Sequence, residues 1–172
     1  MGELSATGVM ITGVYGSGKS SIAKEVAYLL EQRHQPYALL DLDFLGWWCG
    51  YSDDDAAGFR LMLRNLEGVA SNYRDAGISV FVVAYFVSGT QEMLGVRDAI
   101  GVPLRVVRLS ASLTVIERRL AADVTTERKE NLREAARQIT TGEGVGVEDV
   151  VIHNDRPVGV VAQQILAWLG WL

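Results

Sequence analysis

An α/β fold with a parallel sheet is predicted by three features of this 172-residue sequence. Short apolar runs alternate with longer amphipathic segments, which is the pattern of consecutive βα units. The apolar runs are nearly continuous in hydrophobicity, as expected for strands that helices cover on both faces. A glycine-rich segment, residues 13–20, directly follows the first apolar run and directly precedes the first helical pattern. This strand–turn–helix order is typical of α/β proteins that bind phosphate groups.

Five strands are predicted from runs rich in Val, Ile, Leu or aromatic residues. These runs are Gly8–Thr12, Tyr37–Leu42, Ile78–Val87, Leu104–Leu109 and Asp149–His153. Six helices are predicted between and after them. They are Lys19–Arg33, Ala56–Ala76, Gln91–Ile100, Leu113–Ala122, Lys129–Ile139 and Pro157–Leu169. The alternation predicts a sheet whose helices fill both of its sides.

Helical spacing and end signals support these helices. In the first helix, Ile22, Val26 and Leu30 recur on one face. Gly77 and Gly170 are expected to end the second and the last helix. Thr90 and Ser112 are expected to act as N-caps of the third and the fourth. The fifth helix is rich in charged residues and is expected to face solvent.

Length and composition favour a single domain over residues 1–172. The net charge of −5 argues against general nucleic-acid binding, which depends on a basic surface. No apolar run approaches the roughly 20 residues that cross a bilayer, and the first residues do not resemble a secretory signal. The only cysteine, Cys49, cannot form an internal disulfide, which suits the cytoplasm. Trp168 and Trp171 could pack within one chain or between two, so a homodimer remains open.

Residues Gly13–Ser20 read Gly-Val-Tyr-Gly-Ser-Gly-Lys-Ser and match the pattern G-x-x-x-x-G-K-[ST] in every fixed position. The glycines allow the backbone to surround an anion with N–H groups, and the following helix adds a partial positive charge. Lys19 can reach the β- and γ-phosphates, and the Ser20 hydroxyl can bind Mg²⁺. The nucleotide site is therefore predicted to include Gly13, Tyr15, Gly16, Ser17, Gly18, Lys19, Ser20 and Ser21. This segment, Gly13–Ser20, is called the phosphate loop below.

Two aspartates, Asp41 and Asp43, stand at the end of the second predicted strand. Ligands of parallel sheets bind beyond the carboxyl ends of the strands, so both are expected to face the phosphate loop. On an extended chain, residues at i and i+2 point the same way. One carboxylate could then hold hydrated Mg²⁺, and the other could accept a proton from a hydroxyl group. The alternative is that one or both cap a strand–helix turn.

These motifs resemble those of the small P-loop kinases of metabolites, which include shikimate kinase, gluconate kinase, adenylylsulfate kinase and chloramphenicol phosphotransferase. The resemblance rests on the phosphate loop, on Asp41-Leu42-Asp43, and on Val106–Leu109 followed by Glu117–Leu120. It implies a P-loop NTPase fold with three layers, α/β/α, and a five-stranded parallel sheet in the order 2-3-1-4-5. It also implies a short lid, as in nucleoside monophosphate kinases, over about residues 121–135.

The resemblance further assigns roles to individual residues. Asp43 would be the acceptor-binding carboxylate and base, and Asp41 would hold Mg²⁺ beside Ser20. Arg119 and Arg128 match the arginines that contact adenine and the transferred phosphate. Arg60 matches an arginine that binds the acceptor in shikimate kinase. The catalytic residues expected on this basis are Lys19, Asp43, Arg119 and Arg128.

A separate physical argument also favours arginines near the phosphates. Phosphoryl transfer depends on alignment and on neutralising charge over the γ-phosphoryl oxygens. Cationic side chains are crowded into the predicted lid and its flanks: Arg118, Arg119, Arg128, Lys129 and Arg133. The alternative for each of them is a solvated helix face.

The nucleotide is expected to be ATP. The third strand, Ile78–Val87, lacks an acidic residue, which disfavours motor proteins, transport ATPases and most signalling GTPases. The guanine-reading Asn-Lys-x-Asp signature is also missing. Asn154, at the start of the loop before the last helix, could line the adenine edge or could simply form a turn.

The acceptor is expected to bind between the Asp43 turn, the helix that carries Arg60, and the end of the third strand. Aromatic residues gather there: Phe44, Trp47, Trp48, Tyr85 and Phe86. Trp47 and Tyr85 could stack on a planar or sugar-like acceptor or could be core residues, whereas Trp48 is expected to be structural.

These observations predict an ATP-dependent phosphotransferase that uses Mg²⁺ and phosphorylates a hydroxyl group of a small molecule. Two alternatives remain open at this point. One is an ATP-sensing module that binds without transfer, and the other is a nucleoside or nucleotide kinase.

Overall fold

The computed structural model describes residues 6–47, 55–121 and 128–171. Within these residues, one parallel sheet has the strand order β2-β3-β1-β4-β5, so the predicted order is confirmed. The strands are β1 (Thr7–Thr12), β2 (Ala38–Asp41), β3 (Val80–Ala84), β4 (Leu104–Ser110) and β5 (Val150–His153). The central strand β1 pairs with β3, where Val9 lies opposite Val82. It also pairs with β4, where Ile11 lies opposite Val107.

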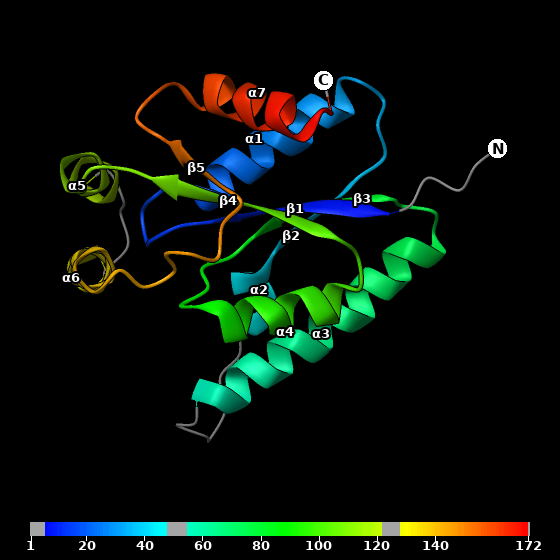
Figure 1. Cartoon of the computed structure of the whole chain (residues 1–172), viewed down its shortest axis with the longest axis horizontal. Coiled ribbons are helices and arrows are strands. Elements are labelled where there is room, and N and C mark those ends of the chain that lie inside the picture. Colours follow the sequence, from blue (N-terminus) through cyan, green and yellow to red (C-terminus); the bar gives the residue numbers. More distant parts are fainter. Residues whose placement is uncertain (1–5, 48–54, 122–127, 172) are drawn as a thin grey trace.

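Helices cover both faces of the sheet (Figure 1). One face carries α1 (Lys19–Glu31) and α7 (Val158–Leu169), and the other carries α3 (Asp55–Asp75) and α4 (Thr90–Ile100). A short helix, α2 (Leu42–Gly46), follows β2 directly. The remaining pair, α5 (Leu113–Ala121) and α6 (Arg128–Thr141), lies beyond the end to which β4 points.

Each face of the sheet has its own hydrophobic core. On the α1–α7 side, Ile22, Val26 and Leu30 are buried against Ile11 and Ile165. The predicted apolar face of the first helix is therefore confirmed. On the other side, a second cluster includes Met10, Met62, Leu66, Phe81 and Val83. Burying one large apolar side chain completely contributes about 1.5–3 kcal/mol to the stability of the fold. The two cores therefore hold the strands, and with them the loops at the strand ends, in place.

Several predicted bounds differ from the structure. The strand predicted to reach Leu42 ends at Asp41, and β3 is shorter than the predicted range 78–87. Gly89, rather than Thr90, is the N-cap of α4. Ser112 does cap α5, since its hydroxyl accepts the N–H of Val115 at 3.3 Å. Because β5 lies at the sheet edge, it is only partly covered, so the expectation of two covered faces is wrong for this strand.

The charged helix α6 also differs from the prediction that it faces solvent. Leu132 and Ala135 pack against Ile116 and Leu120 of α5 and form a third small core. One turn further along, Gln138 is also buried. Three residues spaced at i, i+3 and i+6 thus form one buried stripe on an otherwise charged helix.

The two C-terminal tryptophans pack against the core of their own chain. The guanidinium carbon of Arg105 lies 3.6 Å from the ring centroid of Trp168. Arg105 also donates to the Trp168 carbonyl at 3.0 Å. The homodimer stays a prediction, because neither ring needs a second chain for its burial. None of the helices within the described ranges combines the length and the hydrophobicity that crossing a bilayer requires.

Candidate active site

The phosphate loop connects β1 to α1 through a tight turn. The N–H of Ser17 donates to the carbonyl of Val14 at 3.1 Å, and Gly16 stands at the third position of this turn with a φ of 73°. A type II turn requires such a left-handed residue there, which is why glycine is needed. Gly18 has a φ of 97° and is the N-cap of α1. The loop therefore adopts the conformation that its glycines predict.

Side chains from two distant elements hold the outer carbonyls of this loop. Arg119 of α5 donates to the carbonyl of Ser17 at 3.1 Å and to that of Gly16 at 3.5 Å. Asn154, directly after β5, donates its amide to the Ser17 carbonyl at 2.7 Å. A peptide N–H points opposite its carbonyl, so the N–H of Gly18 is directed to the other side. That side is the one where an anion would bind.

Lys19 folds back on its own loop. Its ammonium group donates to the carbonyls of Gly13 at 3.0 Å and Val14 at 3.3 Å. Burial lowers the pKa of Lys19, while the nearby carboxylates of Asp43 and Asp41 act in the opposite direction. The ammonium group is thus partly buried and paired with two backbone carbonyls at the edge of the cavity described next.

A cavity of about 370 Å³ lies between the phosphate loop, the start of α1 and Asp43. It is lined by Tyr15, Gly16, Gly18, Lys19, Ser20, Ser21, Asp43 and Leu120. The structure thus brings six of the eight predicted nucleotide-site residues together with the predicted base. Ser17 is completely buried, and its N–H donates to Val14 within the turn. It therefore stabilises the loop and does not line the cavity. Gly13 lies at the start of the loop and lines a different cavity.

The two aspartates play different roles in the structure. Asp41 is the N-cap of α2, and its carboxylate accepts the N–H of Asp43 at 3.3 Å. The chain therefore turns into a helix at the fully buried Leu42, and the prediction of an extended segment through Asp43 is wrong. The capping alternative holds for Asp41. Asp43, in the first turn of α2, faces the cavity instead.

The surroundings of Asp43 suit a base. Burial raises the pKa of this carboxyl, the ammonium of Lys19 lowers it in part, and Asp41 raises it further. A base works best when its pKa approaches the working pH, so a raised carboxyl pKa favours proton acceptance. Asp41 and Asp43 both influence Lys19, which places all three charges close together.

The predicted acceptor residues differ in exposure, and the electrostatics of Tyr85 involve Asp43. Tyr85 is half-buried, and burial together with Asp43 and Glu92 raises the pKa of its hydroxyl to about 12. Phe44 and Trp47 form a stacked pair with ring centroids 5.9 Å apart. These rings are 65% and 79% exposed, so they are not core residues. Arg60 lies on an exposed position of α3.

Some predicted residues lie beyond what the structure describes. Trp48 and Cys49 are outside the described residues, and so are residues 122–127 of the lid that was predicted over about 121–135. The rest of that range belongs to the end of α5 and to α6. Arg128 is the first residue of α6, but its side chain is not among those described. Arg119 is placed at the phosphate loop, where it contacts carbonyl groups. Its role in transfer stays a prediction.

Asn154 is 1% exposed and holds the loop rather than forming an exposed turn. Its own carbonyl accepts a guanidinium N–H of Arg119 at 2.6 Å. The Oδ1 atom of Asn154 is buried and has no hydrogen-bond partner among the described residues. Asn154 thus links the loop after β5 with both the phosphate loop and α5.

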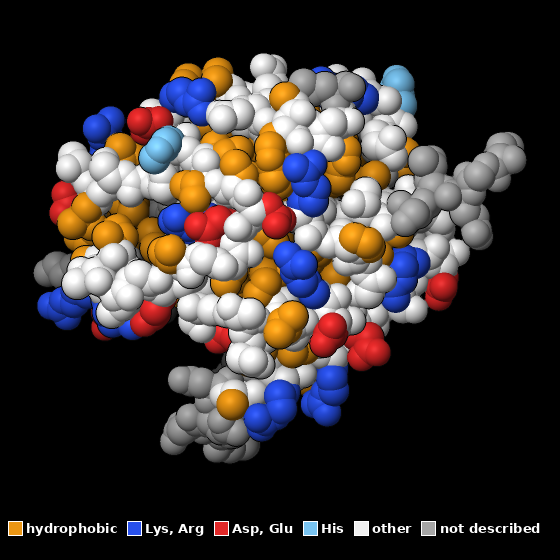
Figure 2. Space-filling model, in the orientation of Figure 1, with side chains coloured by type: hydrophobic (Ala, Val, Ile, Leu, Met, Phe, Trp, Pro, Cys, Tyr) orange, Lys and Arg blue, Asp and Glu red, His pale blue; other side chains and the backbone are white. Residues whose placement is uncertain are grey.

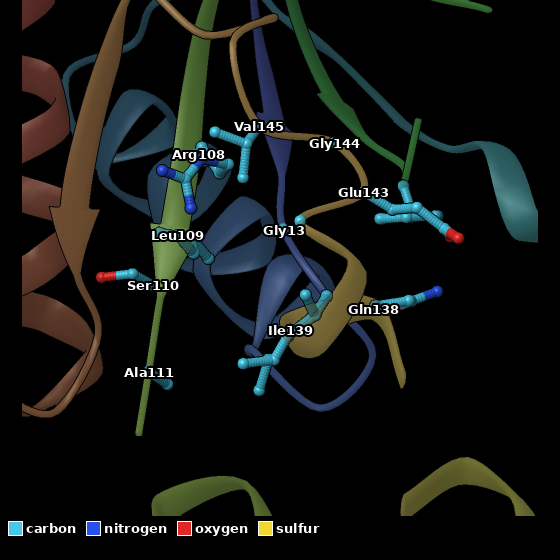
Figure 3. Close-up of a pocket in the computed structure, with 13 residues that line it drawn as sticks. Gly13, Arg108, Leu109, Ser110, Ala111, Gln138, Ile139, Glu143, Gly144 and Val145 are labelled. Carbon is cyan, nitrogen blue, oxygen red and sulfur yellow. The ribbon is translucent and has the colours of Figure 1, made fainter. Parts of the chain in front are cut away.

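A second cavity of about 180 Å³ opens beside the start of the loop (Figure 3). It lies between the end of β4 and the segment that follows α6, and Gly13, Leu109, Ile139 and Val145 are among its lining residues. Arg108, a charged residue of its lining, forms a salt bridge with Glu148 at 2.9 Å. Neither this cavity nor the one at Lys19 is lined by Arg60, Trp47 or Tyr85.

Sequence reasoning missed two residues at the loop. Leu120 covers the cavity from α5, and Gln138 accepts the N–H of Tyr15 at 3.0 Å. Leu120 has a detectable signal, because it follows Ile116 at helical spacing. Gln138 has a weaker one, the stripe that it shares with Leu132 and Ala135.

Solved structures match this chain over nearly its whole length, although no protein-family profile and no curated protein matches it. A sugar kinase from a Janibacter species is 20% identical, with 96% of this chain and 95% of that chain covered and a TM-score of 0.67. An APS kinase from Mycobacterium tuberculosis is 24% identical, with 96% and 98% covered and a TM-score of 0.66. A shikimate kinase from Acinetobacter baumannii is 18% identical, with 97% and 94% covered and a TM-score of 0.61.

This chain has the fold of the small P-loop kinases. The resemblance that the motifs indicated is therefore confirmed at the level of the fold. In a P-loop kinase fold the carboxyl ends of the central strands form the ligand-binding edge. Lys19, Ser20 and Asp43 lie together at that edge in this chain.

The phosphate loop of this P-loop kinase fold is expected to tolerate no side chain at Gly18. Alanine would be forced into a φ of 97°, and its Cβ would lie 2.6 Å from the Asn154 amide. We expect Gly18→Ala to lower the free energy of unfolding by about 1–3 kcal/mol, measured by urea denaturation. Gly68→Ala is the control, because Gly68 lies inside α3 with no atom within 4 Å of the new Cβ. The control should gain about 0.5–1 kcal/mol, and equal effects would contradict the steric argument.

Proposed function

We propose that this protein transfers the γ-phosphate of ATP to a hydroxyl group of a small molecule. The observation that carries the proposal is the single cavity in which Lys19, Ser20 and Asp43 meet. The kinds of proteins that share the fold support it. One is a sugar kinase, another is a shikimate kinase solved with shikimate, and the APS kinase was solved with AMPPNP and APS.

The phosphate loop would bind the triphosphate. The Gly18 N–H and the N-terminus of α1 would face the phosphate oxygens, and Lys19 would leave the carbonyls of Gly13 and Val14 to contact them. Alignment by fixed donors is the main requirement of phosphoryl transfer, because the protein performs little covalent chemistry in this reaction. Arg119 and Asn154 would keep the loop in its binding conformation through its carbonyls.

The donor set at the cavity fits Mg²⁺. The Ser20 hydroxyl, which lines the cavity, and the carboxylate of Asp41 at the adjoining start of α2 are oxygen donors of the kind that this ion prefers, directly or through water. When bound, Mg²⁺ would neutralise part of the negative charge on the β- and γ-phosphates. Because Asp41 also caps α2, one of its oxygens is already engaged.

Asp43 would act as the base. The acceptor oxygen would attack the γ-phosphorus while its proton passes to the Asp43 carboxylate. The bond between the γ-phosphorus and the oxygen that bridges to the β-phosphate would break, and ADP would leave with that oxygen. Asp43 must be deprotonated at the start, so its raised pKa sets the lower pH limit of the reaction.

The acceptor would bind on the α2–α3 side of Asp43. The exposed Phe44–Trp47 stack offers a flat apolar surface, which favours acceptors with a planar or sugar ring. Tyr85 would remain protonated at neutral pH and could donate a hydrogen bond to such an acceptor. Arg60 and Arg128 are proposed as further contacts, with acceptor and phosphate respectively. On the face drawn in Figure 2, basic and acidic side chains are interspersed. Together with the net charge of −5, it favours a small molecule over a polynucleotide end.

The proposal is tested by an ADP-release screen with Mg·ATP over hydroxyl compounds of several classes. The panel contains sugars, sugar acids, nucleosides, adenylylsulfate and aminocyclitol or phenylpropanoid antibiotics. We expect at least one compound to give turnover above the Lys19→Ala blank, and mass spectrometry to find the acceptor heavier by one phosphoryl group. Tight ATP binding without any acceptor-dependent ADP release would instead support the ATP-sensing module.

A further inference from the structure

The buried side chain of Gln138 makes a contact that the proposed mechanism does not use. It lies in the last turn of α6, is only 6% exposed, and accepts the N–H of Tyr15 at 3.0 Å. Its amide group donates to Glu134 at 2.9 Å, one helical turn earlier. Figure 3 shows that Gln138 and its neighbour Ile139 point to different sides of the end of α6. A buried amide is stabilising only when both of its ends are paired, as they are here.

The hydrogen bond of Gln138 is to the peptide group that joins Val14 and Tyr15 in the phosphate loop. The peptide between Val14 and Tyr15 has its N–H on Gln138. Its carbonyl accepts both the N–H of Ser17 and the ammonium of Lys19. The orientation of this one peptide therefore determines the turn and the resting position of Lys19. When Lys19 moves to a phosphate, Gln138 still holds the opposite end of the peptide.

The helices α5 and α6 act on the loop together. They share a small core of Ile116, Leu120 and Ala135. From α5, Arg119 holds the carbonyls of Gly16 and Ser17, whereas α6 holds the N–H of Tyr15 through Gln138. A shift of this helix pair relative to the sheet would change both contacts at once. The helix pair thus holds the turn at both ends: Gln138 binds the N–H of Tyr15, and Arg119 binds the carbonyls of Gly16 and Ser17.

We propose that Gln138 is a positioning residue that fixes the Val14–Tyr15 peptide and couples the phosphate loop to α6. Its effect on ATP use rests on the proposed function, whereas its effect on the loop does not. Gln138 is not among the residues that line the cavity at Lys19, and its hydrogen bond to that lining is to the backbone of Tyr15. It would therefore act on nucleotide binding through the loop backbone.

The first test replaces Gln138 by methionine, which has a similar length but cannot accept the Tyr15 N–H. Leaving that group without its acceptor is expected to speed exchange of the Tyr15 amide hydrogen about tenfold in the nucleotide-free protein. The KM for Mg·ATP should rise about tenfold with less than about threefold change in kcat, since loop orientation affects binding before transfer. Thr140→Ala is the control on the same helix, because its hydroxyl contacts only the Ala136 carbonyl.

A double-mutant cycle separates this bond from general destabilisation. Tyr15 occupies the second position of the type II turn, where proline fits and removes the N–H. In a Tyr15→Pro background, Gln138→Met should raise the KM for ATP by less than about twofold. In a Tyr15→Ala background, which keeps the N–H but removes the ring, the full tenfold rise should return.

Unchanged Tyr15 exchange in Gln138→Met would overturn the inference, as would an equal rise in KM in the Tyr15→Pro and Tyr15→Ala backgrounds. The melting temperature of each variant is recorded so that kinetics are compared on folded protein. If wild-type protein releases no ADP with any acceptor, the proposed function fails. The Tyr15 exchange rate, measured without nucleotide, still decides the role of Gln138 in that case.

Discussion

Replacing Asp43 by asparagine is expected to lower kcat by about 10²- to 10⁴-fold, the usual range for a positioned base. Asparagine keeps the shape of the side chain but cannot take up the hydroxyl proton. The affinity for Mg·ATP, measured by calorimetry, should change by less than about threefold, since in the proposed complex the loop and Lys19 would supply most phosphate contacts. If the proposed function holds, the wild-type protein should also lose activity as the pH falls through the raised pKa of Asp43.

Two observations would contradict this assignment. One is a normal kcat for Asp43→Asn, and the other is an unchanged acidic limb in its pH–rate profile. Asp98→Asn is the matched control, because Asp98 is an exposed carboxylate on α4. Its kcat and pH profile should equal those of the wild type. A loss in both variants would indicate an effect of net charge rather than of a base.

Replacing Lys19 by alanine is expected to lower kcat/KM for ATP by at least about 10²- to 10³-fold. The ammonium group of Lys19 contacts the carbonyls of Gly13 and Val14 and lines the cavity at the loop. In the proposed reaction it would supply positive charge to the transferred phosphate oxygens. Removing one preorganised donor from such a site typically has an effect of this size. Initial rates of ADP release measure the loss of turnover, and calorimetric titration with Mg·ATP measures the loss of affinity.

Lys24→Ala is the control for Lys19→Ala. Lys24 lies on the same helix, α1, but its side chain is exposed. Its kcat/KM should match the wild type. If Lys19→Ala retained full ATP affinity and turnover, the loop would not be the phosphate site, and the proposed function would have to be abandoned. Circular dichroism of both variants confirms that the comparison is between folded proteins.

The sequence predicted the fold well because its signals are local. Runs of apolar residues identified the strands, and the glycine pattern identified the loop. The sheet order followed from the resemblance to P-loop kinases and is confirmed. Lys19, Ser20 and Asp43 also meet as predicted, since the carboxyl ends of neighbouring parallel strands lie at one edge.

The parts that could not be predicted depend on contacts between distant residues. Gln138 lies 123 positions from the Tyr15 N–H that it accepts, and Asn154 lies 137 positions from the Ser17 carbonyl. The helical stripe that includes Gln138 indicates burial but not its partner, and the position of Asn154 indicates only an adenine-edge residue or a turn. The start of α2 was missed for another reason. An Asp before a buried Leu fits both a strand end and a helix cap, and only the packing of Leu42 decides between them.

The contacts of Lys19 with its own loop also bear on how the chain folds in the absence of nucleotide. A buried ammonium without partners would strongly disfavour the native state. Here the carbonyls of Gly13 and Val14 accept hydrogen bonds from it without any nucleotide. Folding is therefore expected to precede nucleotide capture, and refolding from denaturant should proceed at the same rate with and without Mg·ATP.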